Sequence, residues 1–207
     1  HSTPGGKMRS IASSAGPIDA GPTVLTMRPV FEDLFRSVGE RLEDHVTLVR
    51  QKILARHWWP DGSTLDLFDD YETSQQEIYK FAGLVGFREF QSFFQKTNRL
   101  FEAFNEPMMQ SSTPSQFEAT RVVAKKPSLL KDLAPFQSLA SSLKRHFTDP
   151  RLSQLFGRYS TYVGGSPYSS PALLSLIWQA EAKGVWTVQG GMHFLARTLK
   201  KLAESRG

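Results

Sequence analysis

The spacing of apolar residues near the start of the chain predicts a helix that follows a loop. Between residues 29 and 38 the apolar positions recur on one helical face, at Phe31, Leu34, Phe35 and Val38. Pro29 suits the first position of a helix and Gly39 suits its end. Residues 29–38 are therefore predicted to be helical, and residues 1–28 are predicted to be loop with one or two short extended pieces.

The next stretch has the alternation and the turn residues of β structure. Residues 46–50 and 53–59 are extended candidates, and residues 64–67 alternate polar and apolar side chains. Pro60-Asp61-Gly62 between them has the chemistry of a tight turn. We therefore expect a small antiparallel sheet with a hairpin in this region.

The apolar period becomes helical again from residue 73 onward. The pattern predicts helices over 73–82, 86–106, 128–134, 136–147, 149–162, 170–183 and 191–204. Pro107 is expected to end the second of them, residues 108–126 are expected to be a flexible connection, and residues 185–189 a short strand. The predicted fold class is α+β: a small antiparallel β-sheet with a mainly helical domain.

A stripe of phenylalanines follows the longest predicted helix, at Phe87, Phe90, Phe94, Phe101 and Phe104. The simplest interpretation is the buried face of a core helix. The alternative is that some of these rings line a pocket for a long apolar ligand or face lipid. The composition keeps both open, because the 207 residues include 15 Phe, 4 Trp and 5 Tyr.

Composition and charge exclude several classes of protein. The chain has no cysteine, so it has neither a disulfide framework nor a thiolate metal site. No apolar run is long enough to span a bilayer, and the first residues lack the apolar segment of a signal peptide. The net charge of +5 comes from scattered residues, densest at Lys200-Lys201, and no nucleic-acid-binding motif accompanies it, so no nucleic acid partner is expected.

The motifs of most catalytic classes are missing as well. The five histidines show no paired metal-ligand spacing, so no metal site is predicted. There is no Gly-x-Ser-x-Gly, no Walker A and no Gly-x-Gly-x-x-Gly. What stands out is Gly5-Gly6-Lys7, followed by Asp19-Ala20-Gly21-Pro22-Thr23. Small residues beside a positive charge suit the close approach of a bulky anion, although such a motif alone also fits a solvated turn.

Four further motifs occur in order after these two. They are Phe147-x-Asp149-Pro150-x-Leu152 with Leu155-Phe156, Tyr162-x-Gly164-Gly165-x-Pro167, Ser170-Pro171-Ala172-Leu173, and Gly184-x-Trp186 with Gly190-Gly191-Met192. With Gly5-Gly6-Lys7 and Asp19-x-Gly21-Pro22, this series resembles the phytoene desaturase family of FAD-dependent carotenoid dehydrogenases. Within that family it is most similar to the bacterial dehydrogenases of hydroxyneurosporene and methoxyneurosporene.

The resemblance implies a fold and a division of the chain. Such enzymes have a glutathione-reductase-like FAD fold of two domains, which begins with a βαβ unit that this chain lacks. The chain is therefore expected to be an internal fragment. Residues 1–28 would be a flavin-contact segment, residues 29–189 the substrate domain, and residues 190–207 the start of a helix that returns to the flavin domain.

The resemblance also implies chemistry. The parent enzyme would introduce a C=C bond into an acyclic carotenoid of the hydroxyneurosporene type by hydride transfer to FAD. The cofactor-binding residues carried over are Gly5, Gly6, Lys7, Asp19, Gly21, Pro22, Thr23, Gly190 and Gly191. No catalytic residue is assigned: Asp66, Asp149 and Glu181 lie in motif-like stretches, but Asp149 already has an explanation as the cap of a helix that starts at Pro150.

An apolar carotenoid substrate implies a location. The parent is expected to be cytoplasmic and peripheral to the inner, photosynthetic membrane, while the sequence carries no signal for an oligomeric state. The isolated chain is expected to be inactive and to bind FAD weakly. Two other functions stay open: another flavin oxidoreductase of the amine-oxidase superfamily, and a non-catalytic substrate-binding or interaction domain.

Overall fold

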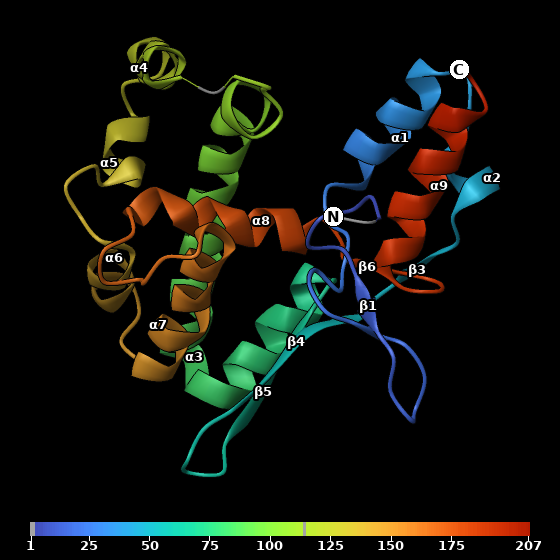
Figure 1. Ribbon diagram of the computed structural model, residues 1–207. Helices are drawn as coiled ribbons and strands as arrows, with labels where there is room; N and C mark the ends of the chain where they lie inside the picture. The colour runs from blue at the N-terminus through green and yellow to red at the C-terminus, as the bar shows by residue number, and fades with distance from the viewer. Residues whose placement is uncertain (1–2, 114) are drawn as a thin grey trace. The chain divides into compact units, whose positions relative to one another are not determined.

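The computed structural model describes residues 3–113 and 115–207, and the chain folds as two compact units (Figure 1). The first, which we call the terminal unit, consists of the chain up to Lys52 together with Lys183–Gly207. The second, the central unit, is Ile53–Ala182. The terminal unit is thus assembled from the two ends of the chain. The functional segments predicted from the sequence, 1–28, 29–189 and 190–207, divide the chain by role and stay a prediction.

The terminal unit is held together by strand pairs of long and short range. Its elements are β1 (Ser10–Ile11), β2 (Ile18–Asp19), α1 (Arg28–Ser37), α2 (Leu42–His45), β3 (Leu48–Arg50), β6 (Trp186–Val188) and α9 (Met192–Glu204). The strands β1 and β2 form an antiparallel hairpin, and β3 pairs antiparallel with β6 so that Leu48 lies opposite Val188. Leu25 adds a further antiparallel bridge to Trp186. The β3–β6 pair and the Leu25–Trp186 bridge join segments that lie more than a hundred residues apart.

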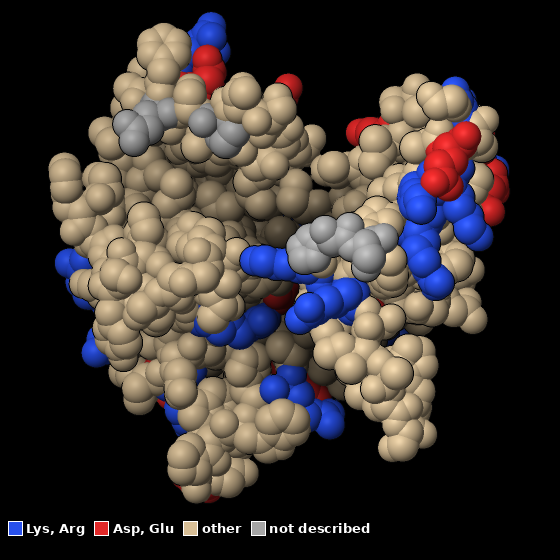
Figure 2. All heavy atoms as spheres, in the orientation of Figure 1, with Lys and Arg blue, Asp and Glu red and all other residues tan. Residues whose placement is uncertain are grey.

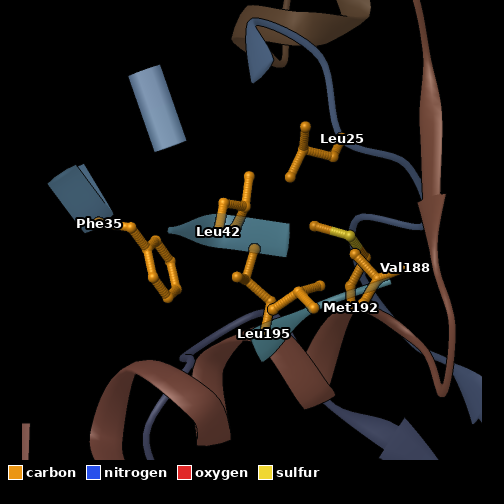
Figure 3. Close-up of a cluster of buried hydrophobic side chains, with 7 residues drawn as sticks. Leu25, Phe35, Leu42, Val188, Met192 and Leu195 are labelled. Atoms are coloured by element: carbon orange, nitrogen blue, oxygen red, sulfur yellow. The ribbon is translucent and has the colours of Figure 1, made fainter. Parts of the chain in front are cut away.

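One apolar cluster fills the space between these elements (Figure 3). Its buried members are Leu25, Phe35, Leu42, Val46, Val188, Met192 and Leu195. The helix α9 contributes because its apolar residues recur on one face, whereas Arg197, Lys200 and Lys201 are exposed. Figure 2 shows Lys and Arg side chains gathered over this helix. The amphipathic pattern of α9 therefore explains how the end of the chain docks on its beginning.

The central unit has one hairpin and several helices. Its elements are β4 (Ile53–Trp58), β5 (Thr64–Phe68), α3 (Tyr71–Phe104), a π-helical turn η1 (Asn105–Met109), α4 (Gln116–Lys125), α5 (Leu129–Leu133), α6 (Leu139–His146), α7 (Pro150–Gly157), the 3-10 turns η2 (Arg158–Val163) and η3 (Ala172–Leu176), and α8 (Ile177–Ala182). The hairpin turn has the predicted residues: Gly62 adopts φ +81°, and Ser63 N–H donates to Asp61 Oδ1 at 2.9 Å. The predicted β4–β5 hairpin is confirmed.

The long helix α3 is interrupted once. Gly83 has φ +67° and ψ −167°, a conformation outside the helical region that glycine adopts without a side-chain clash. The break falls between the two helices predicted over 73–82 and 86–106. The first of them starts where Asp70 Oδ2 accepts the Thr73 N–H at 2.7 Å, which satisfies a free donor of the first turn.

The phenylalanine stripe of α3 is mainly core. Phe90, Phe101 and Phe104 are buried, whereas Phe87 and Phe94 are partly exposed. Phe156 of α7 lies among the aromatic rings around α3, with its centroid 5.5 Å from Trp178 and 6.0 Å from Phe90. The rings pack on one another, which supports the core interpretation for the buried members.

Several predicted boundaries differ from the structure. Residues 46–50 do not join β4 in one sheet, because β3 pairs with β6 instead. Residues 108–126 are not simply a flexible connection, since they include α4, where Ser115 caps the helix by accepting the Glu118 N–H at 3.2 Å. The predicted helices 149–162 and 170–183 each combine a 3-10 turn with a shorter α-helix. Pro107 lies inside the π-helical turn that follows α3.

The docking of α9 gives a test of the terminal unit. Leu195 is fully buried in the apolar cluster, so Leu195→Ala removes buried contacts and leaves a cavity. We expect a loss of about 3 kcal/mol in the free energy of unfolding, measured by urea denaturation. Lys201→Ala on the exposed face of α9 should change it by less than about 0.5 kcal/mol. An equal effect of the two substitutions would contradict this packing.

Candidate functional site

The two glycine motifs near the start of the chain meet at one hollow in the terminal unit. Its volume is about 370 Å³, and its lining residues are Gly6, Lys7, Arg9, Ala20 and Gly21. The hairpin β1–β2 brings the motifs together, and Ala20 N–H donates to the Arg9 carbonyl oxygen at 2.8 Å just beyond the paired residues. Gly5-Gly6-Lys7 and Asp19-Ala20-Gly21 are thus adjacent in space.

Two different constraints explain why glycine occupies these positions: close contacts within the protein, and a backbone that faces open space. A Cβ at Gly21 would lie 1.9 Å from the Lys7 carbonyl oxygen, and one at Gly5 would lie 2.8 Å from the Met8 carbonyl oxygen and 3.0 Å from Cβ of Ala196. These two positions are required by contacts within the protein. Gly6 has φ +56° and would meet nothing within 4 Å, so its backbone faces open space.

The hollow carries positive charge. Lys7 and Arg9 are both exposed, and among the residues that the structure describes neither has an ion-pair partner. Lys7 belongs to the turn that contains Gly5 and Gly6, Arg9 directly precedes β1, and both side chains line the hollow. Arg9 was not among the residues predicted from the sequence, because the β1–β2 hairpin is what places it at the hollow.

Asp19 connects this loop to the last helix. Its Oδ2 accepts the Met192 N–H at 2.9 Å, and Gly191 before it has no side chain with which to cap α9. A Cβ at Gly191 would lie 2.7 Å from Asp19 Oδ1. The carboxylate of Asp19 therefore takes the place of an N-cap side chain and lies favourably at the positive end of the helix dipole.

The other predicted cofactor-binding residues lie around this site without lining the hollow. Pro22 and Thr23 are exposed on the segment that follows Gly21. Gly190 has φ +87° and forms the turn into α9, where a Cβ would meet only the ring of Phe194 at an ordinary 3.7 Å. Of the predicted residues, Gly6, Lys7 and Gly21 line the hollow, and the roles of all nine stay a prediction.

A second group of polar side chains is buried in the central unit. Glu181 is 5% exposed and accepts hydrogen bonds from Arg158, from the hydroxyl of Tyr159 at 2.8 Å, and from that of Tyr162. Burial raises the pKa of both tyrosines, and burial together with nearby Arg158 lowers the pKa of His57. The carboxylate of Glu181 is thus fully used as an acceptor for its neighbours.

The other two acidic residues that the motifs singled out also have internal partners. Asp149 caps α7 by accepting the Arg151 N–H at 2.8 Å, which confirms the capping prediction. Asp66 pairs with Arg56, whose Nε and second guanidinium nitrogen each lie 2.7 Å from a carboxylate oxygen. No general base follows from these contacts.

Metal-binding clusters and membrane-spanning helices are both absent from the described part of the chain. Within residues 3–113 and 115–207, no group of three or more His, Cys, Asp or Glu side chains is placed to hold a metal ion. Over the same residues, no helix is both long enough and apolar enough to cross a membrane.

Comparison with known proteins gives the family of this chain. The sequence profile described as flavin containing amine oxidoreductase matches residues 2–207. The chain belongs to the flavin-containing amine oxidoreductase family. The description of the family says that its members contain flavin, so a nucleotide-binding loop is expected in each member. In this chain, the hollow lined by Lys7 and Arg9 is the candidate for part of that loop.

Relatives within the family share much of the sequence. The chain is 50% identical over 204 residues to a hydroxyneurosporene desaturase of Cereibacter sphaeroides and 47% identical over 204 residues to one of Rhodobacter capsulatus. Each alignment covers 99% of this chain and 41% of the relative. A 4,4'-diapolycopene oxygenase of Methylomonas is 30% identical, over 98% of this chain and 41% of the relative. The resemblance to carotenoid dehydrogenases is confirmed, and the chain spans about two fifths of the length of these relatives.

Solved structures of putrescine oxidase resemble this chain in fold. Putrescine oxidase, in its wild-type form bound to putrescine, superposes with a TM-score of 0.52 at 12% identity, covering 96% of this chain and 41% of that one. A double mutant of the same enzyme gives 0.53 at 13% identity, covering 98% and 41%. This likeness concerns the fold alone, and it agrees with the predicted mixture of helices and small antiparallel strand pairs.

The residues at the hollow fit a flavin nucleotide. FAD carries two phosphates, and Lys7 and Arg9 offer two exposed cations without carboxylate partners among the described residues. Gly6 leaves its backbone open to the hollow, as close approach of a phosphate requires. Lys7, Arg9 and the backbone at Gly6 are therefore groups of this chain that could hold a phosphate of the cofactor.

The Asp19 cap predicts a measurable link between the loop and α9. Asp19→Ala leaves the Met192 N–H without its acceptor, so we expect a loss of about 1 kcal/mol in the free energy of unfolding. Asp19→Asn keeps an oxygen acceptor and should restore most of it. Asp44→Ala, at an exposed aspartate of α2, is the control and should have little effect. Urea denaturation measures all three, and a loss equal in the Ala and Asn variants of Asp19 would contradict the cap.

The buried hydrogen bonds of Glu181 predict a larger loss in the free energy of unfolding than the Asp19 cap does. Glu181→Gln leaves the largely covered Arg158 without its counter-ion, so the free energy of unfolding should fall by about 3 kcal/mol. The matched control is Glu204→Gln, which breaks the exposed pair with Lys200 and should cost less than about 0.5 kcal/mol. Chemical denaturation of the two variants compares them directly. Equal losses would show that burial does not strengthen the pair.

Proposed function

We propose that this chain supplies part of the flavin site and part of the substrate domain of an FAD-dependent carotenoid desaturase. The substrate would be an acyclic carotenoid of the hydroxyneurosporene type, into which the enzyme introduces a C=C bond. The observation that carries the proposal is the 50% identity over 204 residues to the hydroxyneurosporene desaturase of Cereibacter sphaeroides. Three relatives with that name, from different bacteria, are 42–50% identical to the chain.

The residues of the chain divide this work between them. Bound FAD would supply the hydride-accepting ring that dehydrogenation requires. Lys7 and Arg9 neutralise phosphate charge, and Gly6 lets the backbone approach it. Asp19 holds the loop against the start of α9, so that the two flavin-contact segments keep one geometry. Pro22, Thr23, Gly190 and Gly191 belong to the same two segments.

The fold proposed for the whole protein is the two-domain FAD fold of the glutathione-reductase type. In it the segments 1–28 and 190–207 serve the flavin domain, and residues 29–189 serve the substrate domain. The aromatic core around Phe156 gives that domain a rigid frame on which a long apolar substrate can be placed. A substrate confined to lipid favours a protein peripheral to the inner membrane on its cytoplasmic side.

Turnover by the whole protein tests the proposal. With FAD bound, it should convert hydroxyneurosporene to a product with a longer conjugated system, seen as a shift of the absorption bands to longer wavelength. Putrescine and other amines should give no peroxide. Turnover of amines alone would replace the proposal with an amine oxidase, the alternative that the family and the putrescine oxidase fold leave open.

A paired variant tests the flavin loop. Lys7→Gln with Arg9→Gln removes both cations from the hollow and should weaken FAD binding by the whole protein about tenfold or more, measured by flavin fluorescence. The control pair, Arg197→Gln with Lys201→Gln, makes the same change of charge on the exposed face of α9. The 207-residue chain alone should bind FAD weakly. Unchanged affinity in the first pair would remove the hollow from the flavin site.

A further inference from the structure

The central unit holds a second positively charged hollow, well away along the chain from the glycine loops. Its volume is about 600 Å³, and its lining residues are Ser92, Lys96, Arg99, Ser128, Lys131, Asp132 and His146. Helix α3 supplies three of them on one face, since Ser92, Lys96 and Arg99 are spaced by four and three residues. The other walls are α5 with the residue before it, and the end of α6 (Figure 1).

The charges of this hollow do not balance. Three cationic side chains face one carboxylate, Asp132, and Arg99 Nε already donates to Asp132 Oδ2 at 2.9 Å. Lys131 is exposed and has no ion pair within the described ranges of the chain. The surplus is therefore about two positive charges, on Lys96 and Lys131.

Lys96 is a cation of the hollow that is partly buried and, within the described part of the chain, lacks a close counter-ion. Its ammonium group is partly buried, and the single polar contact that the described residues give it is the hydroxyl of Ser142, at a long 3.5 Å. Burial lowers the pKa of Lys96, and Arg145 and Arg99 nearby lower it further, against the opposite effect of Asp132. A charge that is desolvated and uncompensated in this way is stabilised by an anion that enters the hollow.

His146 adds a neutral wall. Burial lowers its pKa, and its Nε2 lies 2.8 Å from the backbone carbonyl oxygen of Glu89. Because a carbonyl oxygen only accepts, Nε2 carries the proton and donates it. The imidazole is thus fixed in place by the backbone of α3 and adds no charge, while the hydroxyls of Ser92 and Ser128 offer donors to a ligand oxygen.

Large apolar side chains are exposed on the chain segment that forms the hollow. Phe136 is 100% exposed in the connection between α5 and α6, and Leu130, next to Lys131, is 51% exposed. In Figure 1 this connection loops outward from α5 and α6. Exposed apolar side chains on the segment that also carries Lys131 of the cationic hollow suit a membrane interface, where apolar groups enter the acyl region and cations contact the headgroups.

We propose that the hollow between α3, α5 and α6 binds the phosphate of an anionic phospholipid headgroup, with Phe136 and Leu130 inserted beside it. Lys96 and Lys131 contact the phosphate from two sides, and Arg99 stays with Asp132. The site deepens the proposed function, on which it rests for the choice of lipid over soluble phosphate. It gives a protein that takes its substrate from lipid a defined attachment point in the central unit.

Vesicle binding tests the site. The whole protein is sedimented with vesicles of phosphatidylcholine alone or mixed with phosphatidylglycerol, and we expect clear preference for the mixed vesicles. Lys96→Gln with Lys131→Gln should weaken binding to them about thirtyfold, from about fivefold for each lysine near an anionic surface. Lys131→Gln alone, at an exposed position, should weaken it about fivefold and guards against misfolding of the pair.

A matched control separates the hollow from net charge. Lys200→Gln with Lys201→Gln removes the same charge from the exposed face of α9, where Figure 2 shows other Lys and Arg side chains. This pair should weaken vesicle binding far less. Equal weakening by the two pairs would mean that binding follows total charge, and the proposed site would be wrong.

Two further experiments distinguish a lipid phosphate from free phosphate and separate this proposal from the proposed desaturase function. Phe136→Ser should weaken binding to vesicles, while titration with inorganic phosphate should show little heat. Tight binding of inorganic phosphate together with no effect of Phe136→Ser would overturn the lipid as ligand. Desaturation of hydroxyneurosporene in detergent, without vesicles, tests the proposed function separately. If the lipid site is wrong, the desaturase activity can still be measured, and if the desaturase activity is absent, vesicle binding can still be measured.

Discussion

The pairing of β3 with β6 is the contact on which the terminal unit depends. Leu48–Arg50 and Trp186–Val188 lie far apart in the sequence, and their backbone hydrogen bonds close a loop that contains the whole central unit. Such closure costs chain entropy, which the apolar cluster around Leu195 offsets by burying side chains from both ends of the chain. The pairing ends directly before α9, so it also sets where the apolar face of that helix meets the cluster and where its first N–H meets Asp19.

The same closure explains why the two segments that we propose to contact the flavin are near each other. Gly5-Gly6-Lys7 and Gly190-Gly191 are at opposite ends of the chain, yet Ala196 lies against Gly5 and Asp19 accepts from Met192. Contacts within the protein account for Gly5, Gly21 and Gly191, while Gly6, Lys7 and Arg9 keep free surfaces for a ligand. Some residues of the motifs therefore maintain the loop, and the others keep surface that a ligand can reach.

Local signals made much of the fold predictable. The turn at Asp61-Gly62, the cap at Asp149 and the helical face of α9 each depend on neighbours in the sequence, and each is confirmed. The β3–β6 pairing was not predicted, because nothing in residues 48–50 specifies a partner at 186–188. The helix α4 was missed although Ser115 and Glu118 form a capping signal. The lining role of Arg9 required the hairpin, which places it beside Lys7.

The ends of the central unit leave from neighbouring strands. Arg50 lies opposite Trp186, and Gln51 N–H donates to the Val185 carbonyl oxygen at 2.8 Å. Gln51 is two residues before the start of the central unit at Ile53, and Val185 is three residues after its end at Ala182. An inserted unit whose two ends are already adjacent adds little to the entropy of folding its host. Residues 53–182 thus have the geometry of an exchangeable cassette. A homologous segment could replace it without rebuilding the strand pairs and loops of the terminal unit.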